Sequence, residues 1–210
     1  MIGAIFQSFV LGVVGLLGWR ALENYADARV ARQRGCYESK RVANWMSLTH
    51  SLTAVGLCGV MLASDTLASW ILVPISVSYF AHNIRHCTPG TLIYYHHILS
   101  IAAVIHGFQF ASEDLRWYKW GYMLTEIGSV PLHVMYELRV RPDKTYLVRY
   151  GDDILLLEFV FFIVFRILSV VLVMTHTMLM VTKINALALQ AANLIWVCDL
   201  AEQIIAAMGR

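Results

Sequence analysis

Two adjacent histidines, His96 and His97, stand at the start of an apolar stretch that continues through residues 98–105. An imidazole can act as a general base or as a nucleophile in acyl transfer. Ionisable side chains within a membrane span face a protein interior or a water-filled cavity, and they indicate a functional site by default. The plainer alternative is a pair that reaches out to the lipid headgroups and has no further role.

A second set of ionisable residues lies in two later apolar stretches. Glu126, His133 and Glu137 have offsets of seven and eleven residues, which places them on one narrow stripe of an α-helix. Arg166 lies in the middle of an apolar run and cannot lose its proton, so it must meet a carboxylate, backbone carbonyls or a lipid phosphate. We expect Glu126 to be its partner. The alternative for Glu126 is a structural hydrogen bond to a neighbouring helix.

The elements that must position these residues are predicted to be membrane helices. Hydrophobic residues make up 59% of the chain and charged residues only 14%, where a soluble domain has about 25%. A spanning helix needs about 20 mostly apolar residues. The fold class is therefore an all-α polytopic membrane protein in one compact domain, with about seven transmembrane helices. The predicted spans are 2–22, 44–63, 67–84, 91–111, 117–138, 153–182 and 186–208.

The distribution of Lys and Arg predicts the orientation of these spans. Alternate connections carry twelve basic residues, at Arg20, Arg29, Arg32, Arg34, Lys40, Arg41, Arg85, Arg139, Arg141, Lys144, Arg149 and Arg210, against three at Arg116, Lys119 and Lys183. Basic loops stay on the inner side. We therefore expect the N-terminus outside and the C-terminus on the cytosol or matrix side. The formal net charge of +2 gives no indication of nucleic acid as a partner.

The first segment is predicted to be a retained membrane helix that continues into a charged extension. It carries no charge through residue 19 and is followed by Arg20, whereas a secretory signal has its positive charge before the apolar run. The four cysteines occur singly, without a C-x-x-C pair, and are expected to be free thiols. We expect no metal site and no cofactor.

Six short patterns, in order along the chain, resemble the TLC-domain family. This membrane fold is shared by ceramide synthases, translocating-chain-associating proteins and small lipid-homeostasis proteins. The patterns are the Ser/His segment 47–51, Tyr79-Phe80-x-x-Asn83, the pair His96-His97, the polar cluster 124–129, Phe161-Phe162 with Arg166-Ile167, and Asn193-x-x-Trp196.

The resemblance implies a TLC-like bundle of six helices around an internal cavity. It divides the chain into an N-terminal transmembrane helix with a charged loop (1–43) and a TLC-like membrane domain (44–210). In ceramide synthases the second polar cluster reads His-Asp with a further Asp, and it works with the His pair in acyl transfer from coenzyme A. Here Thr125, Glu126 and Ser129 stand at those positions, and Asn83 replaces an Asp. The chain is therefore more similar to the branch outside the ceramide synthases.

The first functional hypothesis is a TLC-fold protein that binds or organises membrane lipid without strong catalysis. This hypothesis includes an accessory subunit of a larger membrane complex. Its partners would be membrane phospholipids and other membrane subunits. The resemblance implies the endoplasmic reticulum, and a complex subunit would equally fit the mitochondrial inner membrane. The expected lipid-binding residues are His50, Asn83, His133, Arg166, Asn193 and Trp196.

Two other hypotheses remain open. The alternative is an acyl-CoA-dependent lipid acyltransferase of the ceramide-synthase type, with acyl-CoA as substrate, His96 and His97 as catalytic residues and Glu126 as their orienting partner. The third is a di-iron lipid oxygenase, because His82 and His86 have the i,i+4 spacing of a histidine box and the pair His96-His97 follows. Such enzymes need several complete boxes, and only fragments are present.

Overall fold

The chain folds into seven α-helices, and no strand occurs in the residues that the structure describes. This computed structural model describes residues 2–34, 39–63, 68–109, 115–140, 145–176 and 180–208, some of them by their backbone alone. The helices are α1 (Ile2–Arg34), α2 (Ser39–Ala63), α3 (Ala68–Ile84), α4 (Leu92–Gln109), α5 (Leu115–Val140), α6 (Thr145–His176) and α7 (Met180–Met208).

The all-α prediction with seven helices is confirmed, and the main error concerns one boundary. α1 continues to Arg34, as expected for a charged extension of the first helix. The predicted sixth segment, 153–182, is wrong at its end, because α6 stops at His176 and α7 already begins at Met180. The polar residues Thr175 and His176 mark the end of α6, but the apolar residues that follow them extended the predicted segment.

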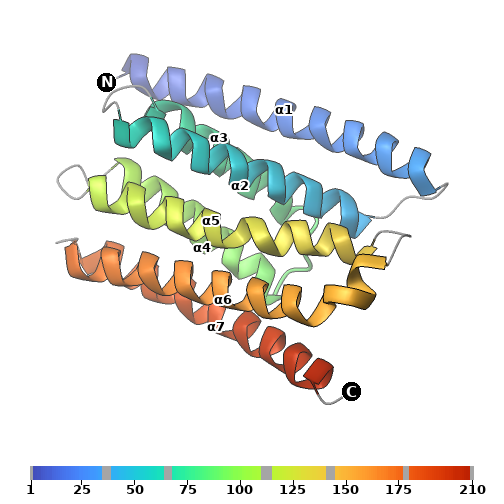
Figure 1. Cartoon of the computed structure of the whole chain (residues 1–210). Helices are drawn as coiled ribbons and strands as arrows, with labels where there is room; N and C mark the ends of the chain where they lie inside the picture. The colour runs from blue at the N-terminus through green and yellow to red at the C-terminus, as the bar shows by residue number, and fades with distance from the viewer. Residues whose placement is uncertain are drawn as a thin grey trace.

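Six of the helices form a closed ring. Neighbours around the ring follow the order α2, α5, α6, α7, α4, α3 and back to α2. The helices run side by side with alternating direction, so the connections fall at the two ends of the bundle, and the N- and C-termini lie at opposite ends (Figure 1). This arrangement encloses the centre of the bundle between helices that are far apart in sequence.

α1 lies outside the ring, against α2 and α3 (Figure 1). Trp19 holds it there: its indole N–H donates to the carbonyl of Ile75 at 3.2 Å, and its ring meets Tyr79 edge-on with centroids 5.2 Å apart. Gly15 permits this close approach, because a Cβ at that position would overlap the side chain of Ser78 on α3. α1 is therefore packed on the ring along α3 and does not float beside it.

Two helices contain a segment that is long and apolar enough to cross a membrane, by length and composition alone. These segments are Arg41–Leu62 in α2 and Leu155–His176 in α6, and shorter apolar segments occur at Ile71–Ile84 and Leu92–Gly107. Among the described cysteines, Cys58, Cys87 and Cys198 are free thiols as predicted, whereas Cys36 lies outside the described residues.

Candidate functional site: a polar cavity inside the helix ring

The ring encloses a cavity of about 290 Å³ that receives side chains from all six of its helices. Its walls combine apolar residues with ionisable and polar ones. The predicted site residues that line it are His50, His96, His97, Glu126, His133, Arg166 and Asn193. Ligand sites in proteins span about 300–1,000 Å³ and are mostly apolar with a few polar groups. The cavity is at the small end of this range, so it would hold part of a lipid and not a whole one.

The carboxylate of Glu126 is bound to residues of α2. One of its carboxylate oxygens accepts a hydrogen bond from the Ser51 hydroxyl at 2.7 Å and lies 3.7 Å from Nδ1 of His50. The other ring nitrogen of His50 contacts the hydroxyl of Ser76 at 3.2 Å. These buried groups satisfy one another across α2, α3 and α5.

Aromatic rings hold His50 in place. Its imidazole stacks on the ring of Tyr79 with centroids 3.9 Å apart and planes only 7° from parallel. The Tyr79 hydroxyl donates to Ser47 at 2.6 Å, and the Tyr122 hydroxyl donates to Ser76 at 3.0 Å. The orientation of His50 is thus fixed by stacking as well as by hydrogen bonds.

Arg166 enters the cavity from α6, near enough to Glu126 for the two opposite charges to attract each other, and its direct hydrogen bond goes to a hydroxyl group. Its guanidinium donates to the hydroxyl of Ser129 at 2.7 Å and lies over the ring of Phe162, 4.9 Å from the centroid. Within the described part of the chain, its buried Nε–H has no hydrogen-bond partner. A guanidinium has five N–H donors, so this buried cation retains capacity to bind an anionic or polar group.

The two adjacent histidines have different surroundings. His97 is buried and faces the rings of Tyr79 and Phe80, at centroid distances of 6.4 Å and 5.6 Å. Nδ1 of His97 has no hydrogen-bond partner among the described residues. His96 lines the same cavity. His106 follows His97 by nine residues and so lies on the opposite side of α4 from it, and it is not a lining residue.

The predicted stripe on α5 faces α2 along its whole length. Nδ1 of His133 contacts the side-chain oxygen of Asn44 at 2.9 Å. One turn further, Glu137 accepts a hydrogen bond from Nε of Arg41 at 3.0 Å in a buried ion pair. Arg41 was counted among the loop charges that set the orientation, and the structure gives it this second role.

The remaining predicted lipid-binding residues fall in three places. Asn193 on α7 lines the cavity and is buried. Asn83 lies at the end of α3 and is not a lining residue. The side chain of Trp196 lies outside what the structure describes. His82 and His86 also lie away from the cavity lining, so the fragments proposed for a di-iron site are not brought together.

The sequence reasoning missed the hydroxyl groups that complete the cavity. Tyr118 and Tyr122 precede Glu126 at four-residue steps, so all three lie on one face of α5. Ser169 of α6 donates to the carbonyl of Gly121 at 2.6 Å and shares a hydrogen bond with Thr125 at 2.8 Å. The four-residue spacing of the tyrosines was the signal in the sequence that could have identified them.

Comparisons of this chain with protein-family models, with curated proteins and with solved structures give no match.

Proposed function

We propose that the protein is an integral membrane protein with a TLC-like fold that binds membrane lipid in the cavity of its helix ring. The observation that carries the proposal is the buried guanidinium of Arg166, which faces the cavity with donor capacity left over. An anionic phospholipid headgroup offers the oxygen acceptors that a guanidinium binds best.

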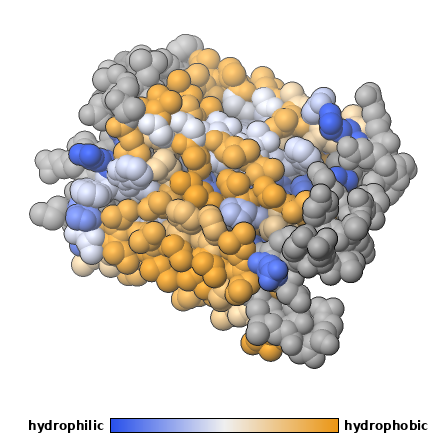
Figure 2. Space-filling view, viewed as in Figure 1, coloured by the Kyte–Doolittle hydropathy of each residue, from blue (hydrophilic) through white to orange (hydrophobic). Residues whose placement is uncertain are grey.

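The polarity of the molecule supports a location in the membrane. Polar and charged side chains are buried, while the outer surface of α6 is apolar, and Figure 2 shows a broad hydrophobic area over this helix. The exposed apolar residues of α6 are Leu156, Leu157, Val160, Phe161, Val164, Ile167, Leu168 and Val171. α7 exposes Val181, Ile184, Leu187, Leu194, Ile195 and Ile205. Contiguous apolar surface of this kind indicates contact with lipid or with other membrane subunits.

The geometry favours lipid binding over acyl transfer. A histidine base needs a group that orients it, and the carboxylate of Glu126 is instead bonded to Ser51 and close to His50. We therefore infer a protein without strong catalysis. Its role as an accessory subunit of a larger complex, in the mitochondrial inner membrane or the endoplasmic reticulum, is part of the proposal and rests on the resemblance to the TLC-domain family.

The test is the lipid that accompanies the purified protein. Wild type, Arg166→Met and Arg20→Met are purified in mild detergent and analysed by native mass spectrometry and lipid extraction. We expect phospholipid at a fixed ratio with wild type and with Arg20→Met, whose arginine is exposed on α1. Arg166→Met should retain at most about one tenth of it, the loss expected for one charge-assisted contact worth about 1.4 kcal/mol or more. Equal lipid in all three proteins, or none in any, would contradict the proposal.

A second assay on wild type and on His97→Ala separates lipid binding from acyl transfer. Each protein is incubated with labelled acyl-CoA and with lipid acceptors, and product is measured together with any covalent acyl adduct. Turnover that is lost in His97→Ala would replace the proposal with the acyltransferase alternative. We expect no turnover in any variant.

A further inference from the structure

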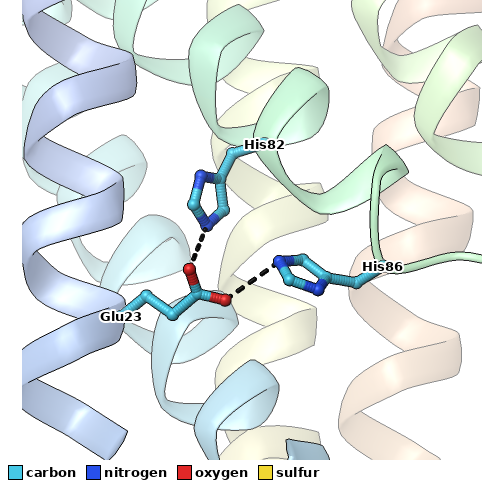
Figure 3. Close-up of side chains that lie close together, drawn as sticks. All are labelled: Glu23, His82 and His86. Carbon is cyan, nitrogen blue, oxygen red and sulfur yellow. Dashed lines mark ion pairs between the residues drawn. The ribbon is translucent and has the colours of Figure 1, made fainter.

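Three ligating side chains meet between α1 and α3, outside the ring cavity. The carboxylate of Glu23 points at the imidazoles of His82 and His86 (Figure 3). Nε2 of His82 lies 3.3 Å from one carboxylate oxygen, and Nε2 of His86 lies 2.9 Å from the other. One ligand atom from each of the three residues lies within 4.8 Å of the others.

The sequence explains why these groups converge. His82 and His86 are one helical turn apart, so both imidazoles lie on the same side of the end of α3 and the turn that follows it. α1 approaches this side closely because Gly15 has no Cβ to meet Ser78. Glu23, two turns beyond Gly15, therefore reaches the histidines from the neighbouring helix.

The geometry of the three atoms is that of a ligand set around a common ion. A carboxylate oxygen and a neutral imidazole nitrogen are both acceptors, so such short separations require a shared proton or cation. A tetrahedral Zn²⁺ ion with bonds of about 2.0–2.1 Å separates neighbouring ligand atoms by about 3.4 Å. The separation from Nε2 of His82 to one carboxylate oxygen, 3.3 Å, is close to that value, and the separation from Nε2 of His86 to the other oxygen, 2.9 Å, is shorter.

Arg85 supplies the positive charge in this structure. It donates from Nε to Nε2 of His86 at 2.9 Å, lies 3.0 Å from Nε2 of His82, and pairs with Glu23. Nε2 of His86 therefore presents its lone pair to Arg85, and Nε2 of His82 lies against the same guanidinium. Since the Arg85 side chain is 43% exposed, it can move into solvent and leave this space to another cation.

A second carboxylate lies beside the cluster. Asp27 follows Glu23 by one helical turn on α1. Its Oδ1 is buried and accepts no hydrogen bond from any residue that the structure describes. Burial raises the pKa of Asp27 above its ordinary value; the nearby charge of Glu23 adds to this shift, and His86 opposes it.

We propose that Glu23, His82 and His86 form a binding site for a divalent transition-metal ion, with Zn²⁺ as the best fit. Two imidazoles and carboxylates are ligands that Zn²⁺ accepts, whereas Mg²⁺ and Ca²⁺ prefer oxygen alone. The ion would link α1 to the helix ring, so its role is structural. The site is independent of the lipid cavity and of the function proposed for it.

The test is metal binding by the full chain, purified in detergent without a histidine tag and stripped with a chelator. We expect one Zn²⁺ per chain by elemental analysis, and a tetrahedral Co²⁺ absorption spectrum when Co²⁺ is used as a probe. His86→Gln and Glu23→Gln should each lower the Zn²⁺ affinity at least tenfold. His176→Gln, at the far end of α6 where His176 stacks on Trp117, should leave it unchanged.

Arg85→Gln distinguishes a metal site from a simple ion-pair network. If the cluster binds metal, removal of the competing guanidinium should leave the affinity for Zn²⁺ equal or higher. If the cluster is an ion-pair network around Arg85 and binds no metal ion, this variant should lower the thermal midpoint whether or not Zn²⁺ is present. The proposal is overturned by substoichiometric Zn²⁺ in wild type, by equal affinity in Glu23→Gln, or by loss of binding in Arg85→Gln.

Discussion

The two histidine clusters of this molecule use the same side chain in opposite ways. In the ring cavity each described histidine contact goes to a different partner: His50 meets Ser76, His133 meets Asn44, and His97 faces aromatic rings. At the α1–α3 contact, two imidazoles and one carboxylate direct their ligand atoms at a single space. The first arrangement surrounds a ligand-sized volume, and the second surrounds a volume the size of an ion.

The difference follows from the spacing of the residues along a helix. Adjacent residues such as His96 and His97 differ in direction by about 100° around the helix, so the two side chains point to different neighbours. His82 and His86 are a full turn apart and share one side. Adjacency in sequence is therefore a weaker indication of a shared ligand than i,i+4 spacing is.

The largest effect should come from Glu126→Leu. Glu126 is the only carboxylate among the described residues that line the cavity, and Ser51 donates to it. Its removal leaves the buried guanidinium of Arg166 without a nearby negative charge, so the free energy of unfolding should fall by about 3 kcal/mol. Thermal unfolding of the purified protein measures this.

Glu126→Gln is the control for that prediction, because its amide oxygen can still accept from Ser51. It should cost about 1 kcal/mol, the worth of a charge-assisted bond made neutral. Zn²⁺ affinity should stay at the wild-type value in both variants. An unchanged thermal midpoint in Glu126→Leu would show that the carboxylate does not stabilise the buried guanidinium in the cavity.

Gly107→Leu should have the next largest effect, and only on the cavity. A Cβ at Gly107 on α4 would overlap the ring of Tyr118, which lines the cavity and donates to the carbonyl of Ala103. Overpacking of this kind costs about 1–3 kcal/mol. We expect less bound lipid by native mass spectrometry and unchanged Zn²⁺ affinity. Gly59→Leu, where a Cβ meets nothing within 4 Å, is the matched control.

Gly15→Leu should give the smallest effect, and it should lower the Zn²⁺ affinity while leaving the bound lipid unchanged. The added side chain would push α1 away from Ser78 on α3 and so separate Glu23 from the histidines without changing a ligand. We expect about a tenfold loss of Zn²⁺ affinity, which is about 1.4 kcal/mol, with normal lipid content. Gly18→Leu, on the same helix with open space around it, should bind Zn²⁺ as wild type does. Loss of lipid together with Zn²⁺ would mean that the two regions are coupled.

The amino-acid sequence determined the helices and the faces that they turn inward. Hydropathy gave seven helical segments, and the 3.6-residue period placed Glu126, His133 and Glu137 on one stripe, because both properties depend on residues close together in the chain. It also identified seven of the residues that now line the cavity, since polar groups in apolar helices must turn away from lipid. Between α6 and α7 the predicted boundary fell several residues too late.

Only the tertiary structure decided which groups meet. The guanidinium of Arg166 donates to Ser129 and the carboxylate of Glu126 accepts from Ser51, because the ring order sets which faces oppose each other and at what height. In the sequence, Glu23 is one of the charged residues that follow the first apolar segment. Glu23 meets the histidines at the end of α3 only because α1 packs along that helix. A periodic pattern fixes the direction of a side chain from its own helix, whereas its partner depends on contacts between segments distant in the chain.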